Sequence, residues 1–454
     1  MLQPFTFLPP YARSIFFSGI CGVSMSSLAI ISAMRGYTVS GSDSSAKPKC
    51  SELFKKHGIR MTHYHDTWNS LGYDVLVRTG AVSEDNPDII TARRAGIPVY
   101  SRSEFMGGIL SEYEKRTGIA GTHGKSTVSG MLASICSDST ALIGAESIDL
   151  GGNFRLASKK HVIYEACEYK RAFLDMLPTT AVILNIEREH TDCYKNIAES
   201  VKAYRDFIKN AKRCVLFSDD KNVMKLAPYA ENAIIFSVSD EKADLYAKNI
   251  CQSKGFYSFD AVWHGEKVFN VTLKVPGFHN LKNALAATAA AFCDGINPTE
   301  IKKGLESFCG MKRRLEKLGK FEGADIYDDY AHHPTEIRST LSALKRMGYK
   351  KIICAFQPHT YSRTASFFEE FTHAFEDADK VIFADIFAAR ESNVYGISSS
   401  DLANATENGI YIPKYDDIIS YFAEQAEDEC ALITLGAGEL DTVSAKLARF
   451  GKLC

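Results

Sequence analysis

The stretch GIAGTHGKST, residues 118–127, decides which class of fold this chain can adopt. It nearly matches the phosphate-binding pattern G-x-x-x-x-G-K-[ST], but Ile119 stands where that pattern has its first glycine. The glycines lie instead at Gly121 and Gly124, close before Lys125. The stretch is therefore either a shortened nucleotide loop or a chance run of small residues.

The surrounding sequence favours a nucleotide loop. Residues 117–120 are predicted as a short strand and residues 126–136 as a helix, which places the glycines in a strand-to-helix turn. In such a turn the backbone N–H groups and the helix dipole attract phosphate, and Lys125 supplies a mobile cation. The hydroxyl of Ser126 is suited to a magnesium ion. The alternative is a glycine turn followed by a surface lysine.

The composition limits the classes of protein to consider. A chain of 454 residues is too long for one hydrophobic core and predicts two or three domains. With 45% hydrophobic residues, 24% charged residues and a net charge of -2, it has no electrostatic signature of a nucleic-acid partner. Apolar runs are too short to span a bilayer, and the 12 cysteines form no C-x-x-C pair, which indicates reduced thiols. We expect a cytoplasmic monomer or homodimer that binds no nucleic acid and does not insert into membranes.

The first segment, residues 1–111, alternates strands and helices, as in a parallel sheet that binds ligands at the carboxyl ends of its strands. Its first turn, GICGVS at residues 19–24, lies where a dinucleotide turn G-x-G-x-x-G would lie, but Cys21 and Ser24 replace two glycines. Asp43 follows about twenty residues later, where a ribose-binding acid is found. The turn is either a nucleotide-type site or a plain tight turn.

The second segment, residues 112–311, carries polar groups at two further strand ends. Glu165 ends an apolar strand, and His190 follows another. In a parallel sheet both lie on the edge of the phosphate loop, which makes them candidate magnesium ligands or water-holders, although each alone is more typical of an ordinary loop residue. Further along, a predicted helix opens with His279, Asn280 and Asn283, which either cap it or contact an adenine.

The third segment, residues 312–454, again alternates strands and helices. Polar residues gather at four of its strand ends, at 328–336, 356–364, 385–391 and 436–439, and four such clusters on one sheet indicate a site. The sequence thus predicts an α/β protein of three domains. These are a Rossmann-like N-terminal domain, a central P-loop ATPase domain with a mostly parallel sheet, and a C-terminal Rossmann-like α/β domain.

Taken together, these stretches resemble the Mur ligase family. The motifs that carry the resemblance are GTHGKST at 121–127, NIEREH at 185–190, DDYAHHPTE at 328–336 and FQPHTYSRT at 356–364. The similarity extends from Ile15 to Gly438 and is greatest to those members that join L-alanine to UDP-N-acetylmuramate. It implies that residues 1–111 bind the UDP-sugar, residues 112–311 bind ATP and residues 312–454 bind the amino acid.

The resemblance also implies the reaction, its cofactors and its small-molecule substrates. ATP and Mg2+ would convert the lactyl carboxylate of UDP-N-acetylmuramate into an acyl phosphate. The amine of L-alanine would then attack it to form an amide, in the synthesis of a peptidoglycan precursor. Lys125 would neutralise the migrating phosphoryl group, and the amides of residues 122–126 would hold a phosphate.

The family's functional positions match residues of this chain in four groups. The nucleotide would be bound by Gly121, Thr122, His123, Gly124, Lys125, Ser126, Thr127, Asn280, Asn283, Arg314 and Asp329. Magnesium would be held by Ser126, Glu165 and His190, and the UDP-sugar by Gly19, Gly22, Ser42 and Asp43. The amino acid and the acyl phosphate would contact Tyr330, His332, His333, His359 and Arg363. Catalytic roles are expected of Lys125, His190, His332, His333 and Arg363. His332, His333 and His359 are expected to accept the ammonium proton or to stabilise the oxyanion, since an unperturbed histidine titrates near neutrality.

Three positions depart from the family pattern. Cys21 replaces a glycine of the first turn, and Cys167 and Tyr169 alter the E-A-D-E-S run that begins at Glu165. Thr360 stands where some members carry arginine, which makes Arg363 the better candidate for holding the carboxylate of alanine.

Three other functions were weighed against this one. A sister ligase that adds a preformed peptide would share the first two domains, but FQPHTYSRT at 356–364 favours the enzyme that adds one alanine. A non-catalytic nucleotide-binding regulator would be expected to lose Lys125, Glu165 or His190, and all three are present. An NAD-linked oxidoreductase would explain neither the phosphate loop nor the third segment.

The thiol of Cys21 is predicted to be dispensable. The turn serves close backbone approach to a phosphate, so the size of the side chain matters and its sulfur chemistry does not. Cys21→Ala and Cys21→Gly should therefore retain ligase activity. Steady-state phosphate release measures this, and a loss of turnover with UDP-sugar binding intact would contradict the prediction.

Overall fold

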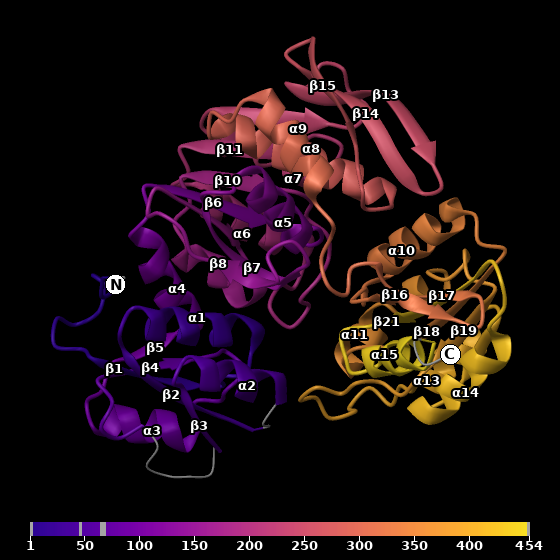
Figure 1. Cartoon of the computed structure of the whole chain (residues 1–454). Helices are drawn as coiled ribbons and strands as arrows, with labels where there is room; N and C mark the ends of the chain where they lie inside the picture. Colours follow the sequence, from indigo (N-terminus) through magenta and orange to yellow (C-terminus); the bar gives the residue numbers. More distant parts are fainter. Residues whose placement is uncertain (1–2, 45–47, 64–69, 452–454) are drawn as a thin grey trace.

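The computed structural model describes residues 3–44, 48–63 and 70–451, which form three α/β domains, each with its own sheet (Figure 1). Strands alternate with helices in all three, and each sheet is parallel over most of its width, so the predicted fold class is confirmed. The domain boundaries at residues 111 and 311 stay predictions.

The N-terminal domain has a five-stranded parallel sheet in the order β3-β2-β1-β4-β5 over its described residues. Strand order reverses at β1, and ligands of such sheets bind beyond the carboxyl ends of the strands at this point. Helix α1 begins there, with Gly22 as its N-cap. The strands are β1 (Ser14–Ser18), β2 (Thr38–Asp43), β3 (Arg60–His63), β4 (Val75–Arg78) and β5 (Val99–Ser101). The helices are α1 (Val23–Met34), α2 (Pro48–Lys56), α3 (Pro87–Arg94) and α4 (Arg102–Ser111).

The central domain has a ten-stranded sheet in the order β15-β14-β13-β12-β11-β10-β6-β9-β7-β8. Its middle is parallel, while β14, β15 and β8 run antiparallel to their neighbours. The strands are β6 (Lys115–Ala120), β7 (Thr140–Ser147), β8 (Gly152–Arg155), β9 (His161–Glu165), β10 (Thr180–Ile183), β11 (Arg213–Phe217), β12 (Ala233–Ser237), β13 (Leu245–Ser253), β14 (Phe256–Trp263) and β15 (Glu266–Thr272). The helices are α5 (Lys125–Ile135), α6 (Ile197–Ile208), α7 (Lys221–Met224), α8 (Phe278–Cys293) and α9 (Pro298–Ser307), with 3-10 turns at Tyr169–Asp175 and Ala227–Tyr229.

The C-terminal domain has a six-stranded sheet in the order β16-β17-β21-β18-β19-β20, in which only the β16–β17 pair is antiparallel among the described residues. The strands are β16 (Glu316–Phe321), β17 (Ala324–Asp329), β18 (Lys351–Phe356), β19 (Lys380–Phe383), β20 (Gly409–Tyr411) and β21 (Cys430–Leu435). The helices are α10 (Pro334–Met347), α11 (Tyr361–Ser366), α12 (Phe368–Thr372), α13 (Ser399–Ala405), α14 (Tyr415–Gln425) and α15 (Asp441–Phe450).

The strands of these sheets have continuous apolar runs because both faces of each sheet are covered by buried apolar clusters. Parallel strands that are covered on both faces bury every side chain, as in β10 and β21. One cluster contains Phe17 of β1 together with Ile183 of β10, so the N-terminal and central domains share apolar packing. The C-terminal sheet has separate clusters on its two faces, around Phe356 and Ile353 respectively.

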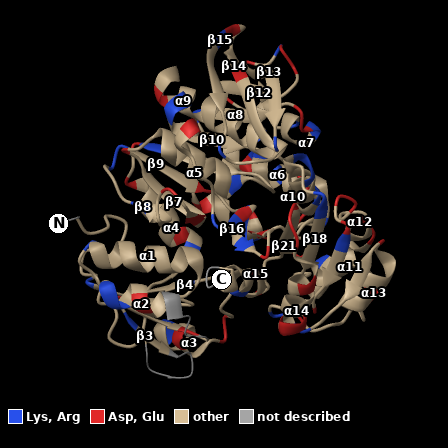
Figure 2. Ribbon diagram, turned by 45° about the vertical axis from the view of Figure 1, so that its right-hand side comes forward, with Lys and Arg blue, Asp and Glu red and all other residues tan. Residues whose placement is uncertain are grey.

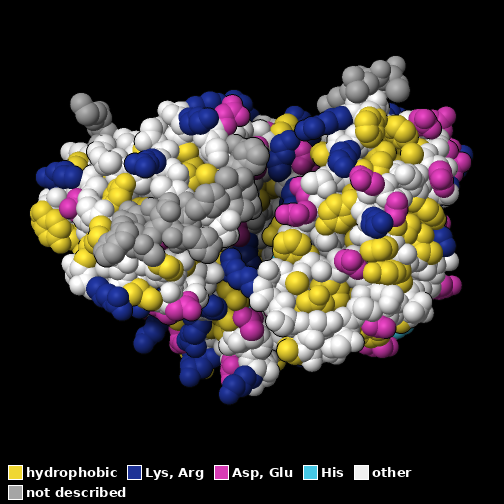
Figure 3. Space-filling model, turned by 90° about the horizontal axis from the view of Figure 1, so that it is seen from below, with side chains coloured by type: hydrophobic (Ala, Val, Ile, Leu, Met, Phe, Trp, Pro, Cys, Tyr) yellow, Lys and Arg dark blue, Asp and Glu magenta, His cyan; other side chains and the backbone are white. Residues whose placement is uncertain are grey.

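The surface carries charges of both signs on all three domains (Figure 2). Seen from below, a cleft edged by charged side chains separates the N-terminal from the C-terminal domain (Figure 3). Within the described residues, none of the helices has both the length and the apolar character needed to cross a bilayer.

Candidate active site

The loop between β6 and α5 has the backbone shape of a phosphate-binding turn. Gly121 and Gly124 have φ angles of 149° and 87°, in the region that favours glycine. A Cβ at Gly121 would lie 2.9 Å from Cβ of Leu184, and one at Gly124 would lie 2.7 Å from Oδ1 of Asn283. Neither position has room for a side chain. The shortened loop is therefore a specific strand-to-helix turn and not a chance run of small residues.

Asn185, at the end of the neighbouring strand, holds this loop in place. Its Oδ1 accepts the N–H of His123 at 2.8 Å, and its Nδ2 donates to the carbonyl of His123 at 3.0 Å. The carbonyl of Asn185 accepts the N–H of Thr122 at 3.2 Å. Two of the amides expected to bind phosphate thus donate to Asn185 in this structure, and the turn from residue 124 to residue 126 lies at the start of α5.

Lys125 is held beside the loop by a buried ion pair. Its Nζ lies 3.0 Å from Oε2 of Glu168 and also donates to the carbonyls of Gly121 and Thr122. Burial alone would lower the pKa of Lys125, but the carboxylates around it, Glu168 foremost, raise the pKa above its ordinary value. The lysine is therefore a permanent cation, and a phosphate in the loop would compete with Glu168 for it.

The three residues predicted to hold magnesium lie on the same edge of the central sheet. Oγ of Ser126 donates to Oε2 of Glu165 at 2.7 Å. Nε2 of His190 lies 3.4 Å from Oε1 of Glu168, which pairs with Lys125. The structure thus brings Ser126 and Glu165 into contact and connects His190 to the loop through Glu168. Hydroxyl and carboxylate oxygens are the donors that Mg2+ prefers, so Ser126 and Glu165 fit the ion, while His190 lies beside Glu168.

A cavity of about 920 Å³ opens beside the loop, between the central and C-terminal domains. It is lined by eight of the residues predicted to bind nucleotide: His123, Gly124, Ser126, Thr127, Asn280, Asn283, Arg314 and Asp329. The N-cap of α8 is Gly277, so neither asparagine is the N-cap. Nδ2 of Asn283 donates to Oδ1 of Asn280 at 3.0 Å, which fixes both amides at the cavity wall.

Asp329, at the end of β17, is already well bonded within the protein. Its Oδ2 accepts the N–H of Leu315 and the hydroxyl of Thr340, both at 2.9 Å, and its Oδ1 accepts the N–H of Ala331 at 2.8 Å. Burial raises the pKa of this carboxyl group. Asp329 therefore orders the loops around it, and its expected contact with ribose stays a prediction.

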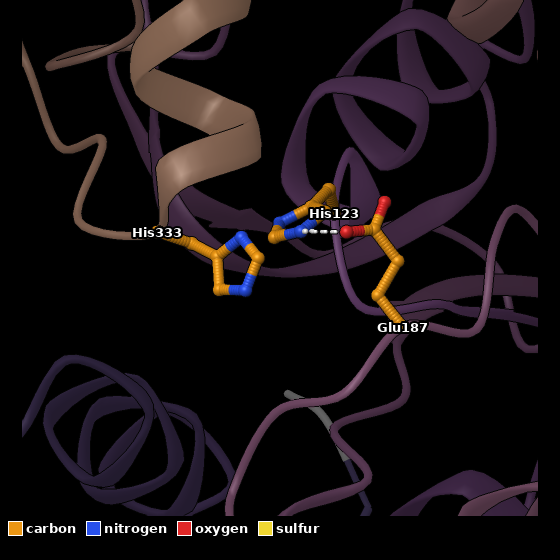
Figure 4. A group of neighbouring side chains, drawn as sticks. All are labelled: His123, Glu187 and His333. Carbon is orange, nitrogen blue, oxygen red and sulfur yellow. Dashed lines mark ion pairs between the residues drawn. The ribbon is translucent and has the colours of Figure 1, made fainter. Parts of the chain in front are cut away.

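A cluster of titratable residues joins the phosphate loop to the start of α10, and Figure 4 shows three of its members, His123, Glu187 and His333. Nδ1 of His123 lies 3.0 Å from Oε1 of Glu336, and its Nε2 lies 3.7 Å from Oε2 of Glu187. Although burial opposes it, these two carboxylates raise the pKa of His123 to about 9. His123, Glu187 and His333 also have the spacing of a metal site. In this structure His123 is paired with the two carboxylates, and a metal ion would have to displace its proton to bind there.

The residues predicted to surround the amino acid converge at the edge of the C-terminal sheet. The ring of His332 lies 5.4 Å from that of Tyr330 and 6.1 Å from that of His359. Nη1 of Arg363 lies 3.0 Å from Nδ1 of His359. Nε2 of His333 lies 3.7 Å from Glu189, to which Arg363 is bonded, so His333 borders the same space.

These imidazoles do not titrate near neutrality, contrary to the sequence-based expectation. Burial, together with the neighbouring Arg363, lowers the pKa of His332 to about 3 and that of His359 to about 4. Burial also lowers the pKa of His333. At neutral pH all three are therefore neutral imidazoles.

Arg363 crosses the domain junction to Glu189. Its Nε and Nη2 lie 3.1 Å and 2.5 Å from Oε1 of Glu189. Burial would raise the pKa of Glu189, but Arg363 and the nearby histidines lower it to about 2, so the carboxylate is ionised. Arg363 is the residue predicted to bind the carboxylate of alanine, and Glu189 has no predicted role.

In the N-terminal domain, the residues predicted to contact the UDP-sugar shape the turn after β1. Gly19 has a φ angle of 83°, and its N–H donates to the carbonyl of Ser42 at 2.8 Å. Oδ2 of Asp43 accepts the N–H of Cys21 at 2.8 Å, and the hydroxyl of Ser42 donates to the buried Asp88. Ser42 and Asp43 thus hold the turn through hydrogen bonds, while Gly19 is part of the turn.

A second cavity, of about 180 Å³, lies between the N-terminal and central domains. It is lined by Ser24 and Arg102 on one side and by Gly144, Glu165 and Cys167 on the other. It therefore extends from the start of α1, beside the predicted sugar turn, to the glutamate predicted to hold magnesium.

Five polar residues that organise the site received no role from the sequence. They are Asn185, Glu187 and Glu189 in NIEREH, Glu336 at the end of DDYAHHPTE, and Glu168, three residues after Glu165. A signal was present, because each motif places carboxylates beside histidines or across from a predicted cation. The partners lie in different segments of the chain, however, and sequence spacing does not show which ones meet.

A phosphate loop that faces a second Rossmann-like domain across a large cavity defines a multidomain nucleotide-dependent enzyme. The chain belongs to the Mur ligase family, whose members are ATP-dependent ligases. The Mur ligase family catalytic domain matches residues 14–114, the Mur ligase middle domain matches residues 119–291, and the Mur ligase glutamate ligase domain matches residues 313–438.

Similar proteins cover nearly the whole chain. A UDP-N-acetylmuramate–L-alanine ligase of Caldicellulosiruptor saccharolyticus is 40% identical over 441 residues, which is 94% of this chain and 97% of the relative. The ligase of the same name from Clostridium acetobutylicum is 40% identical over 442 residues, 94% and 96% of the two chains.

Solved structures share the fold. The UDP-N-acetylmuramate-alanine ligase MurC of Thermotoga maritima superimposes with a TM-score of 0.83 at 24% identity, over 97% of this chain and 99% of that one. A MurF ligase of Thermotoga maritima in complex with ADP has a TM-score of 0.64 at 15% identity, over 91% and 95% of the two chains.

Lys125→Ala is predicted to abolish ligation while UDP-sugar binding persists, because Lys125 lies at the phosphate loop and the predicted sugar turn lies in another domain. Loss of one contact to the transferring phosphoryl group should cost on the order of 3 kcal/mol or more, about a hundredfold in rate. Phosphate release measures turnover, and calorimetry with the UDP-sugar is the binding control. Near-normal turnover would overturn the role of the loop.

Proposed function

We propose that this chain joins L-alanine to the lactyl carboxylate of UDP-N-acetylmuramate, with ATP as the source of the phosphoryl group. The observation that carries the proposal is the junction of the central and C-terminal domains, where the phosphate loop and the predicted amino-acid pocket face one another. The relatives at 40% identity, which bear the name of this activity over nearly their full lengths, support it. We also propose the domain roles predicted from the sequence, with the sugar bound by residues 1–111, ATP by 112–311 and alanine by 312–454.

The phosphate loop and Arg314 would supply positive charge from two domains. Lys125 is ionised beside the loop, and Arg314 lines the large cavity from the opposite domain. Charge that develops on a transferring phosphoryl group is stabilised most by such preorganised cations in a site that excludes water. Exclusion of water would also protect the acyl phosphate from hydrolysis.

Mg2+ is proposed as the metal, held by Ser126, Glu165 and His190. The contact between the hydroxyl of Ser126 and the carboxylate of Glu165 at 2.7 Å supports this set, because both oxygens suit a hard cation. When bound, the ion would neutralise phosphate charge and orient the oxygens.

The sugar would enter from the N-terminal domain. Gly19 and Gly22 flank the turn after β1, and the second cavity leads from there toward Glu165. Ser42 and Asp43 would act by supporting this turn, since their side chains bond within the domain. This path would bring the lactyl carboxylate to the phosphate edge of the central sheet.

His332 would take up the proton that the attacking amine releases. Its Nδ1 donates to the carbonyl of Tyr330 at 2.8 Å, which leaves Nε2 open as a general base requires, whereas Nδ1 of His359 accepts a bond from Arg363. We place this chemistry in the cytoplasm, where ATP and the sugar nucleotide are available, and in a monomer or homodimer.

His190→Ala is expected to lower activity and to raise the Mg2+ concentration needed for half-maximal turnover. The imidazole lies on the phosphate edge of the central sheet, beside Glu168, as a metal ligand or the holder of a metal-bound water. A magnesium titration of turnover measures the effect, with His264→Ala as a control because His264 is an exposed histidine beside Asp244. An unchanged titration would leave His190 with only a structural role.

L-Alanine is expected to be the preferred amine. Phosphate release should be measured with UDP-N-acetylmuramate, ATP and each of L-alanine, glycine and a tripeptide. Glycine lacks the methyl group of alanine, so the enzyme should favour alanine over glycine by about 1–3 kcal/mol. Faster release with the tripeptide would favour the sister ligase that adds a preformed peptide.

Arg363→Lys should raise KM for alanine about tenfold and leave KM for ATP unchanged, because lysine cannot reproduce a planar guanidinium contact.

A further inference from the structure

The ion pair between Arg363 and Glu189 joins two domains through side chains that are almost fully buried. Glu189 lies in the loop after β10, and Arg363 lies in α11 of the C-terminal domain. The two side chains are 9% and 13% exposed, and both guanidinium contacts fall on one oxygen, Oε1. The other oxygen of the carboxylate is therefore left to a different partner.

That second oxygen has no hydrogen-bond partner. Oε2 of Glu189 is buried and accepts no bond, and Nε2 of His333, 3.7 Å away, is likewise buried without a partner. Nδ1 of His333 accepts the N–H of Thr335, so the neutral ring carries its proton on Nε2 and cannot take one there. A buried carboxylate oxygen without a donor is costly, and such groups in native proteins have a reason, often a missing ligand.

We infer that Glu189 binds the ammonium group of the amino-acid substrate, while Arg363 binds its carboxylate. This rests on the proposed function, because it assigns a residue to the amine of that reaction. An α-amino acid at neutral pH carries one positive and one negative group. Inserted between Arg363 and Glu189, it replaces one direct ion pair by two, and the charges of the junction stay balanced.

The position of Glu189 places the amine where the reaction needs it. The next residue, His190, lies 3.4 Å from Glu168, which in turn pairs with Lys125 of the phosphate loop. An ammonium group held by Glu189 therefore lies beside the phosphate edge of the central sheet, next to the neutral imidazoles of the pocket. Once a proton has left it, the nitrogen is already close to the acyl phosphate that it must attack.

The other carboxylates near the pocket are already committed to protein donors. Glu187 accepts the hydroxyl of Thr335 at 2.8 Å and faces His123. Both oxygens of Glu391 accept bonds from Ser362, at 2.8 Å and 2.5 Å. Among these groups Glu189 alone combines contact with Arg363 and an unpartnered oxygen, in the part of the chain that the structure describes.

The test compares Glu189→Gln, Glu189→Asp and the unaltered chain at saturating ATP and UDP-N-acetylmuramate. Loss of one charged contact should raise KM for L-alanine about ten- to a hundredfold in Glu189→Gln. Glu189→Asp, which keeps the charge, should recover most of the affinity. Glu376→Gln is the control, because Glu376 is an exposed glutamate of the C-terminal domain beside His373, and it should change KM for alanine less than threefold, roughly the scale of a surface change.

Two further amines separate binding of the ammonium group from an indirect effect through Arg363. L-Alaninamide keeps the ammonium group and lacks the carboxylate, so its inhibition of alanine-dependent turnover should weaken in Glu189→Gln and stay unchanged in Arg363→Lys. Hydroxylamine is a neutral nucleophile that needs neither anchor, so its capture of the acyl phosphate should proceed equally in all variants.

Each outcome decides a different point. An alanine KM in Glu189→Gln within twofold of the unaltered chain would overturn the role of Glu189. A raised alanine KM with unchanged inhibition by L-alaninamide would also overturn it, because Glu189 would then act only by orienting Arg363. If the unaltered chain releases no phosphate with L-alanine and forms no hydroxamate, the proposed function itself fails, whatever the variants do. Melting temperatures show whether each variant is folded.

Discussion

The assembled site depends on one buried carboxylate, that of Glu336 in the first turn of α10. One of its oxygens lies 3.0 Å from His123 of the phosphate loop and 3.6 Å from Arg314, and the other accepts the N–H of His332 at 3.1 Å. A single side chain thus positions the nucleotide loop, a cation of the cavity and the amino-acid pocket relative to one another. Because an unpaired buried charge is strongly unfavourable, separating the two domains would cost more than their apolar contacts alone suggest.

Two cations of the junction are paired with carboxylates that substrates would replace. Lys125 is held by Glu168 where a phosphate would lie, and Arg363 is held by Glu189 where a carboxylate would lie. Each pair keeps its cation ionised and aligned, which lowers the reorganisation needed when the anion arrives. The pairing also weakens binding, since each substrate must displace an internal partner. The same two ion pairs therefore preorganise the cations and lower the affinity for the substrates.

Much of this architecture follows from the sequence, and the reasons are local. The strand-to-helix turn at Gly121 and Gly124 and the alternation of strands and helices depend on neighbouring residues, so they were predictable. Parallel strands bring their carboxyl ends to one edge, which is why Glu165 could be placed near Ser126 from the sequence alone. The pairing of Arg363 with Glu189 could not be predicted in this way, because it joins two domains across 174 positions of sequence. The low pKa of His332 also depends on burial that no local pattern reports.

The structure also accounts for two of the positions at which this chain departs from its family. Tyr169 packs its ring 4.8 Å from that of His190, and its hydroxyl donates to Asp192 at 3.0 Å, so it packs against the histidine and bonds to the loop after it. Thr360 begins α11 with a φ angle of 66°, and its hydroxyl accepts the N–H of Arg363 at 3.4 Å. It therefore acts as a cap that orients the helix carrying Arg363. The positive charge that some members have at that position is absent here, which leaves Arg363 as the cation that Glu189 faces and makes their pairing the central contact of the amino-acid pocket.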